Sequence, residues 1–429
     1  MQAALLRAYL YRKLAILNRS RLCLIAMEII EKLLSHAEWK RFLDYKREGG
    51  HLSAAEEENL TKCIENKAYL PAAQRLNNGG FFALPKAVQV NKASSGKKRT
   101  VFVFEESEKL LQKFIAFCLL DYDGIFADNC YAFRRHTGVK KAVAALMFDK
   151  EIDGMYAYKL DIADYFNSVE PTLLLPMLQR AIPSEKKLYR ILEEMLLNPY
   201  ALVDGEQRTM RKGILAGSPV SGFMANLFLT ELDKHFAHIN AKYARYSDDI
   251  IVFAKTQEAL QEHIDYMQRF LEEHKLSVNP KKVALTAPGE KWTFLGFSYH
   301  RGCIDISPVS KQKMKKKMRR KARALHRWQQ NKGVPPERAA RAFVKYFDKK
   351  LYHNPVNNEI TWSRWYFPII NTGDSLRELD GYTQQCLRYI ATGKRNSAQF
   401  RFTYHEMKAL GYTTLVNRFY RFKQQKWMH

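Results

Sequence analysis

Two acidic segments that lie far apart in the chain constrain its fold most strongly. Residues 156–161 (Tyr-Ala-Tyr-Lys-Leu-Asp) show a period-two alternation rich in strand formers, which predicts a β-strand ending at Asp161. Residues 246–249 (Tyr-Ser-Asp-Asp) lie between two short runs of strand formers, which predicts a hairpin with its turn at residues 247–249. A hairpin turn beside a strand end can bring the carboxylates of Asp161, Asp248 and Asp249 together.

Three neighbouring carboxylates indicate a particular chemistry. Hard divalent cations prefer carboxylate oxygens, and two such ions held a few ångströms apart stabilise the attacking and leaving oxygens of an in-line phosphoryl transfer. This is the chemistry of a polymerase. Residues 246–249 taken alone also fit an ordinary solvated turn, so the neighbouring motifs decide between the two interpretations.

Further short motifs accompany the carboxylates. They are Lys-Arg-Thr-Val-Phe-Val at residues 98–103, Tyr-Ala-Phe-Arg at 131–134, Asp-Ile-Ala-Asp-Tyr-Phe at 161–166, Gly-Ser-Pro-Val-Ser at 217–221, Asn-Pro-Lys-Lys at 279–282 and Phe-Leu-Gly-Phe at 294–297. In this order, and with residues 246–249, they make the chain resemble the reverse transcriptases over about residues 80–300. The resemblance is to the bacterial enzymes of the group II intron, retron and phage-defence lineages. Each motif is weak alone, but five or more in the right order are a strong signal.

The chain departs from the family pattern in the loop that grips the template. Ala216 stands where most of the family has Gln, and Gly222 stands where many members have Pro. This form is more like the defence-associated (class 2-like) bacterial enzymes than the retroviral or intron ones. The chain also has neither the Val-Thr-Gly signature of retrons nor a tail rich in Cys and His.

The resemblance implies an α+β fold of the polymerase right-hand type, with fingers, a palm whose antiparallel sheet is backed by helices, and a helical thumb. We expect a helical region at residues 1–80, fingers and palm at residues 81–300, and a helical thumb with a C-terminal extension at residues 301–429. Apolar residues at helical spacing between Val220 and Leu232 predict a core-facing helix behind the active site.

The resemblance also implies a catalytic centre. Two Mg²⁺ ions, with Mn²⁺ as an alternative, are expected on Asp161, Asp248, Asp249 and the carbonyl of Ile162. Lys282 is the expected proton donor to the leaving pyrophosphate.

Other residues are implied to bind substrate and nucleic acid. Phe166 is the expected gate that collides with a 2′-hydroxyl. The remaining candidates are Lys98, Arg99 and Arg134 for the triphosphate, Ala216, Gly217, Ser221 and Tyr246 for nucleotide, primer and template, and Phe294 and Gly296 for the primer grip.

The charge of the chain points to a polyanionic partner. It carries 70 Lys and Arg against 44 Asp and Glu, a formal charge of +26 at pH 7 and a sequence pI near 9.7. Ten basic residues fall between Lys311 and Arg327 without one acid, while Met314, Met318, Ala322 and Leu325 form an apolar stripe at helical spacing. We expect one thumb helix here that contacts the phosphates of a duplex through Lys316, Arg320 and Arg323.

The remaining composition is typical of a cytoplasmic protein. The six cysteines show no paired spacing, so we expect reduced thiols in the core. Arginines and lysines interrupt the apolar N-terminal segment, which predicts an amphipathic helix rather than a secretory signal, with an organelle transit peptide as the alternative. The uncharged run at residues 213–230 is too polar and too broken to span a membrane.

These observations lead to one functional hypothesis and several alternatives. We expect an RNA-directed DNA polymerase that uses deoxynucleoside triphosphates to copy a structured noncoding RNA into cDNA, in bacterial defence against phage. The alternatives are a retron- or intron-type enzyme with another template, an untemplated or protein-primed DNA polymerase, and a non-catalytic RNA-binding protein of the maturase type. A viral-type RNA polymerase generally has Asp five positions after the first metal Asp, where this chain has Phe166.

Overall fold

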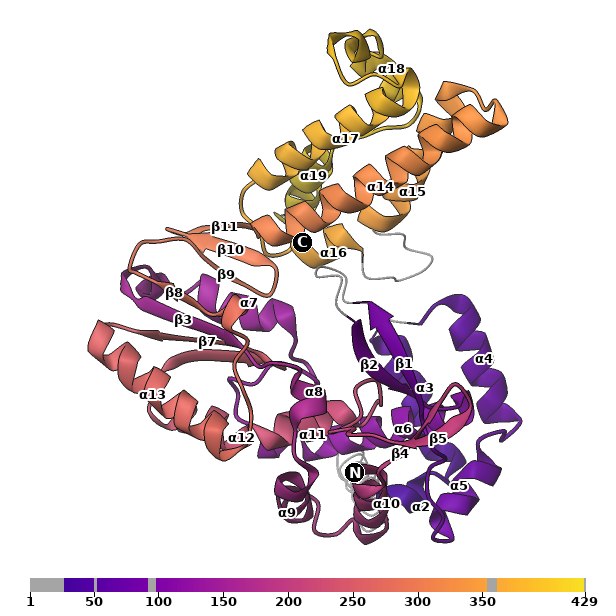
Figure 1. Cartoon of the computed structure of the whole chain (residues 1–429), viewed down its shortest axis with the longest axis vertical. Coiled ribbons are helices and arrows are strands. Elements are labelled where there is room, and N and C mark those ends of the chain that lie inside the picture. Colours follow the sequence, from indigo (N-terminus) through magenta and orange to yellow (C-terminus); the bar gives the residue numbers. More distant parts are fainter. Residues whose placement is uncertain (1–26, 50–51, 92–97, 353–360, 428–429) are drawn as a thin grey trace, which may run out of the picture.

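The computed structural model describes residues 27–49, 52–91, 98–352 and 361–427. The amphipathic helix expected at the N-terminus lies outside these residues. The chain is an α+β protein whose helical C-terminal bundle stands above a set of mixed sheets and helices (Figure 1). None of the helices in the described ranges is both long and apolar enough to cross a membrane.

The N-terminal part consists of helices that pack onto α6 (Glu106–Leu119). They are α2 (Ile29–Lys32), α3 (His36–Glu48), α4 (Ala54–Glu65) and α5 (Leu70–Asn77). Trp39 of α3 is fully buried and stacks on Tyr69 with ring centroids 4.3 Å apart, while Phe114 of α6 lies 4.4 Å from the same ring. The predicted helical region therefore has its own aromatic core. Its proposed boundary follows α5, where Gly79 takes a φ of +91°.

A second layer forms the region expected to be the fingers. The strands β1 (Lys86–Asn91), β2 (Lys98–Val103), β4 (Tyr200–Val203) and β5 (Glu206–Thr209) make one sheet in the order β2-β1-β4-β5. β1 and β2 are an antiparallel hairpin, and β4 runs parallel to β1. The helices α9 (Pro171–Ala181) and α10 (Lys186–Leu197) lead into β4.

The central sheet is antiparallel, as predicted for a palm. Its order is β6 (Lys242–Tyr246), β7 (Asp249–Ala254), β3 (Tyr156–Asp161) and β8 (Ala284–Thr286). Alternate residues of the sheet face two different cores: Tyr158 and Val252 pack with residues of α13 (Gln257–Glu273), whereas Ala157 and Phe253 pack with residues of α7 (Val139–Met147). The sheet is therefore buried on both faces (Figure 1).

The core-facing helix expected near residue 224 is present as two helices. α11 (Ser221–Phe228) and α12 (Thr230–His238) meet at Leu229, and the predicted apolar residues between Val220 and Leu232 are all buried. Short 3₁₀ turns at η1 (Leu120–Ile125), η2 (Lys150–Gly154) and η3 (Pro280–Lys282) and the helix α8 (Tyr165–Ser168) complete this part.

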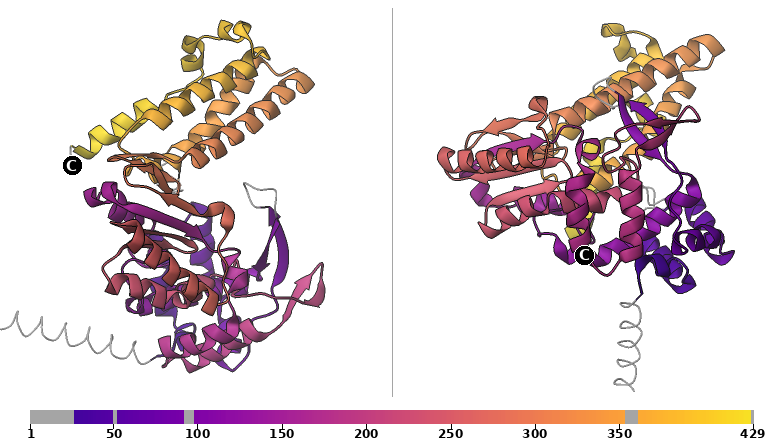
Figure 2. Two further views of the ribbon diagram at one scale, coloured as in Figure 1. Left: turned by 60° about the vertical axis from the view of Figure 1, so that its left-hand side comes forward. Right: turned by 60° about the horizontal axis from the view of Figure 1, so that its bottom comes forward.

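A small antiparallel sheet links the palm to the helical bundle. Its strands are β9 (Trp292–Phe294), β10 (Phe297–His300) and β11 (Cys303–Ile306). The bundle follows, with α14 (Pro308–Lys332), α15 (Pro336–Leu351), α16 (Trp362–Tyr366), α17 (Asp374–Thr392), η4 (Ser397–Arg401), α18 (Tyr404–Ala409) and α19 (Leu415–Trp427). Figure 1 and the left view of Figure 2 place this bundle above the small sheet.

The long basic helix is confirmed. α14 starts after Ser307, whose hydroxyl accepts a hydrogen bond from the backbone N–H of Ser310, and ends at Gly333 in the left-handed conformation. The four residues of the predicted apolar stripe are the buried residues of this helix. The cysteine prediction was partly wrong, because Cys303 is exposed on β11 and Cys63 is only half-buried.

Candidate active site

The three predicted carboxylates lie at one end of the central sheet. Asp161 ends β3 and pairs with Asp249, the first residue of β7. The turn before β7 contains Ser247, with a φ of +61°, and Asp248, so the turn is one residue shorter than predicted. The backbone N–H of Ile162 donates to the carbonyl of Asp248 at 3.1 Å and ties the hairpin to the neighbouring strand.

Lysine side chains lie against these carboxylates. The ammonium group of Lys282 makes an ion pair with the buried carboxylate of Asp161. The Nζ of Lys159 lies 3.6 Å from Oδ1 of Asp249. Asn279 fixes the segment that carries Lys282, because its backbone N–H donates to the carbonyl of Asp161 at 2.8 Å. The site therefore already holds positive charge next to two of its acids.

The clustering of acids changes their ionisation. Burial raises the pKa of Asp248 to about 6, and the charges of Asp161 and Asp249 raise it as well. Burial likewise raises the pKa of Asp249, although Lys159 opposes this. Burial acts to lower the pKa of Lys282, but its hydrogen bond to Asp161 and the acidic neighbours raise it overall. The cluster thus carries negative charge that a bound cation would relieve.

The donor chemistry of the cluster fits a hard cation. Within the described ranges, no three His, Cys, Asp or Glu side chains are gathered as a ready metal cluster. Asp161, Asp248 and Asp249 nevertheless offer only oxygen donors, which Mg²⁺ and Mn²⁺ prefer, and lysine ammonium groups already contact two of them. That these three side chains hold metal ions stays a prediction.

A buried ion pair that the sequence did not reveal supports the hairpin. Arg245 of β6 and Asp233 of α12 are both fully buried, and Nε of Arg245 donates to Oδ1 of Asp233 at 2.8 Å. Arg245 also donates to the carbonyl of Ser247 at 3.2 Å, and the hydroxyl of Tyr243 donates to Asp233 at 2.9 Å. The pair therefore connects the turn that carries Asp248 to the helical layer behind it. The available signal was Arg245 between the strand formers Ala244 and Tyr246, since a buried Arg needs an ionic partner.

The loop before α11 packs on strand β2 of the fingers. The carbonyl of Ala216 accepts a hydrogen bond from the N–H of Phe102 at 2.7 Å. Gly217 has a φ of +109°, and a Cβ at this position would lie 2.6 Å from Cγ1 of Val101. Only glycine fits this conformation and this space. The loop therefore joins the expected fingers and palm through backbone contacts.

Ser221 does not have the position that the motif predicted. Its side chain is buried, and its hydroxyl donates to the carbonyls of Ile214 and, at 2.9 Å, Leu215. The motif predicts that this residue packs against nucleic acid. Because the first residue of α11 faces inward, Ser221 stabilises the loop instead.

The departure at Gly222 has a structural reason. A Cβ at Gly222 would lie 2.7 Å from Cγ of Phe133. Phe133 in turn makes an edge-to-face contact with Phe166, with ring centroids 6.2 Å apart. The absence of a side chain at position 222 therefore makes room for an aromatic ring that supports the candidate sugar gate.

Arg134 is predicted to bind the triphosphate, but in this structure its guanidinium contacts other protein groups. Its Nε donates to Oδ1 of Asp123 at 2.9 Å, its guanidinium also donates to the carbonyl of Cys130 at 3.0 Å, and only 6% of its side chain is exposed. These hydrogen bonds of the guanidinium stabilise the segment around η1. Lys98 and Arg99, in contrast, are exposed on β2.

The hairpin at residues 294–297 also differs from its prediction. Phe294 was expected to contact nucleic acid but is fully buried in the core beneath the helical bundle. A Cβ at Gly296, whose φ is +89°, would lie 3.1 Å from the hydroxyl of Tyr366. The hairpin therefore packs against α16, because its apolar ring and its glycine both face the bundle.

The basic face expected on α14 is exposed. Lys316, Arg320 and Arg323 lie on the side of the helix away from its buried stripe. Lys311 and Lys315, nearer α17, pair with Glu378 instead. Tyr246, the last predicted substrate contact, is half-buried at the end of β6.

A model of the family described as "Reverse transcriptase (RNA-dependent DNA polymerase)" matches residues 90–299. The group II intron-encoded protein LtrA of Lactococcus lactis subsp. cremoris is 24% identical over 181 residues, which is 42% of this chain and 30% of that protein. The retron Ec83 reverse transcriptase of Escherichia coli is 25% identical over 143 residues, 30% of this chain and 44% of that protein. The chain thus matches less than half of the length of these relatives.

Solved structures of yeast telomerases are also similar. The telomerase of Candida albicans, in complex with a fragment of telomeric RNA, has a TM-score of 0.42 at 10% identity. This match covers 78% of the present chain and 64% of the telomerase chain. The apo telomerase of Candida tropicalis has a TM-score of 0.44 at 12% identity, and the match covers 53% of this chain and 48% of the telomerase chain. Residues 90–299 thus match the reverse transcriptase family, as the order of the motifs predicted.

Proposed function

We propose that the chain is an RNA-directed DNA polymerase that acts in the bacterial cytoplasm. The observation that carries this proposal is the meeting of Asp161, Asp248 and Asp249 at one end of an antiparallel sheet, inside a domain of the reverse transcriptase family. A carboxylate cluster of this kind suits the transfer of a nucleotide to a 3′-hydroxyl. The exposed basic surface of α14 suits a nucleic-acid partner.

The residues of the site have different roles in this reaction. When bound, two Mg²⁺ ions supply charge that activates the 3′-hydroxyl and neutralises the triphosphate. The three aspartates hold that charge at the end of the sheet. Lys98 and Arg99, exposed on β2, bind phosphates of the incoming nucleotide, and Lys282 gives a proton to the leaving pyrophosphate.

Phe166 selects the sugar in this proposal. Replacing Phe166 by Ala should lower the preference for deoxynucleotides over ribonucleotides by roughly 10- to 100-fold, because a small side chain no longer collides with the 2′-hydroxyl. The ratio of kcat/KM for dATP and ATP measures this preference. Phe148→Ala, which removes a ring that is 61% exposed on the surface, is the matched control. An unchanged ratio in Phe166→Ala would show that Phe166 is not the gate.

The basic face of α14 binds the template–primer duplex in this proposal. Replacing Lys316, Arg320 and Arg323 by Gln should weaken binding and reduce the slope of log K against log salt by about 2 to 3, since each lost phosphate contact reduces it by about 0.9. Binding of a labelled hybrid duplex at several salt concentrations measures the slope. The control replaces three exposed lysines of the outer palm, Lys234, Lys255 and Lys275. Equal slopes in both variants would mean that α14 faces only solvent.

The template is proposed to be a structured noncoding RNA in a defence system against phage. The excess of positive charge supports this, because a broad basic surface holds folded RNA by its phosphates and shape without reading its sequence. Purification from the native locus should yield one dominant small RNA together with cDNA complementary to it. A heterogeneous pool of cellular RNA, or DNA synthesis without any template, would contradict this part of the proposal.

A further inference from the structure

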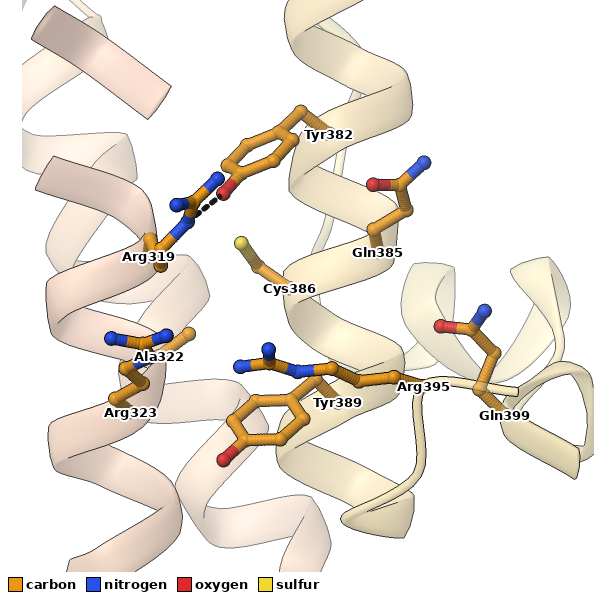
Figure 3. A pocket seen from close by; sticks show the side chains of 9 residues that line it. All are labelled: Arg319, Ala322, Arg323, Tyr382, Gln385, Cys386, Tyr389, Arg395 and Gln399. Atoms are coloured by element: carbon orange, nitrogen blue, oxygen red, sulfur yellow. Dashed lines mark hydrogen bonds between the residues drawn. The ribbon is translucent and has the colours of Figure 1, made fainter. Parts of the chain in front are cut away.

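A groove between α14 and α17 in the helical bundle has the chemistry of a ligand site. It encloses a cavity of about 460 Å³, within the range of roughly 300–1,000 Å³ that is typical of small-molecule sites. Arg319 and Arg323 line it from α14, and Tyr382 and Tyr389 line it from α17 (Figure 3). Arg395 reaches over it from the segment after α17. We call this feature the thumb groove.

The thumb groove is strongly electropositive. None of its lining residues is acidic, and within the described residues Arg319, Arg323 and Arg395 make no ion pair with a carboxylate. Of the nearby acids on α17, Glu378 is already bound by Lys311 and Lys315, and Asp380 accepts hydrogen bonds from the backbone N–H groups of Leu415 and Val416. Guanidinium groups gathered without counter-charges favour an anionic ligand.

The aromatic residues of the thumb groove lie against these cations. The guanidinium of Arg395 stands 4.6 Å from the ring centroid of Tyr389, and Nε of Arg319 donates to the hydroxyl of Tyr382 at 2.9 Å (Figure 3). The two tyrosines are seven residues apart on one helix, about 10 Å along its axis. Flat rings and guanidinium planes beside each other are the surfaces on which unpaired bases stack.

The floor and the outer edge of the thumb groove complete this chemistry. Burial raises the pKa of Cys386 to about 12, so that the thiol adds no negative charge to the floor. Gln385 and Gln399 place two amide groups at the outer side of α17, where both a donor and an acceptor are available. A simple phosphate site needs only the guanidinium groups. A nucleotide can use the guanidinium groups for its phosphate and the aromatic rings and amides for its base.

We propose that the thumb groove binds an unpaired nucleotide of a single-stranded nucleic acid. Its base stacks on the plane of Arg395, which the ring of Tyr389 supports from behind, and its phosphates contact Arg319 and Arg323. The inference rests on the proposed function, since it takes nucleic acid as the partner. Arg323 also borders the exposed basic face of α14, so a strand that leaves a duplex on that face can enter the groove.

Fluorescence anisotropy with the full chain tests this site. The probes are a blunt RNA–DNA hybrid duplex and the same duplex with an unpaired tail of about ten nucleotides, which is within the size of known single-strand sites. The tail should increase the affinity of the parent at least about fivefold, the lower limit for stacking one base on an aromatic ring. Tyr389→Leu and Arg395→Gln should each remove most of this increase while binding the blunt duplex as the parent does.

Matched variants separate the groove from a general loss of structure. Tyr389→Phe keeps the ring and should keep the effect of the tail. Tyr404→Leu and Arg377→Gln change the same residue types elsewhere in the bundle and should also keep it. Thermal unfolding of each variant verifies that the bundle is intact.

The outcomes are distinct. RNA and DNA tails are tested in parallel, and an increase that depends on Tyr389 with either one supports the site, the larger increase identifying the natural strand. The proposal is overturned if the tail adds nothing in the parent, if Tyr389→Leu and Arg395→Gln leave its effect unchanged, or if an acidic peptide such as polyglutamate competes as well as an oligonucleotide. Failure to bind even the blunt duplex would instead count against the proposed function.

Discussion

Replacing Asp248 by Asn is expected to abolish nucleotide incorporation. The substitution removes a carboxylate charge from the centre of the cluster but keeps the size of the side chain. Loss of several kcal/mol of transition-state stabilisation corresponds to a fall in kcat/KM of at least about 1,000-fold. Primer extension at pH 7 with Mg²⁺ measures this fall, and binding of the hybrid duplex should change little.

The same substitution should not harm the fold. Because burial and the neighbouring charges raise the pKa of Asp248 from 3.8 to about 6, the ionised carboxylate destabilises the folded state, and this cost grows as the pH rises from about 4 to about 6. Asn carries no charge, so without divalent ions at pH 7 the variant should be more stable by up to about 3 kcal/mol. A variant that loses activity together with stability would indicate that Asp248 has a structural role instead.

Replacing Arg245 by Met is expected to cause the largest loss of stability. It leaves the carboxylate of Asp233 buried without its ionic partner, which costs about 3–5 kcal/mol. Urea-induced unfolding measures this change. The double variant with Asp233→Leu removes both charges and should regain most of the lost stability, since an apolar pair of similar size fits such a site.

The double variant also tests whether Arg245 positions the turn. It lacks the hydrogen bond to the carbonyl of Ser247, which is 3.2 Å long in the parent. We therefore expect a lower kcat with little change in KM for the nucleotide, although the protein is stable again. Normal kcat in the stable double variant would show that the ion pair matters only for folding.

The local elements of this chain could be predicted from its sequence. The alternation at residues 156–161 and the short turn before Asp249 depend on neighbouring residues, so the strand and the hairpin follow from their own sequence. The stripe from Met314 to Leu325 likewise defines the buried side of α14. Placing the three aspartates together also required the order of the motifs, because β3 and the hairpin are distant in the sequence.

The surroundings of several side chains could not be predicted, because they depend on contacts between distant segments. Phe294 and Ser221 have motif positions that suggest contact with nucleic acid, but packing against the helical bundle and the loop before α11 buries them. Arg134 forms an ion pair with Asp123, and Arg245 forms one with Asp233, which lies on the helix before the strand of Arg245. Periodicity describes which face of an element is apolar, but not which distant side chain will meet a given charge.

Primer extension on a defined RNA template tests the central claim most directly. The purified chain is given an RNA template, an annealed DNA primer, Mg²⁺ and either the four deoxynucleotides or the four ribonucleotides. We predict cDNA complementary to the template with deoxynucleotides, little product with ribonucleotides, and no product from the Asp248→Asn variant. Synthesis that ignores the template sequence, equal use of ribonucleotides, or extension by Asp248→Asn at the rate of the parent would contradict the account.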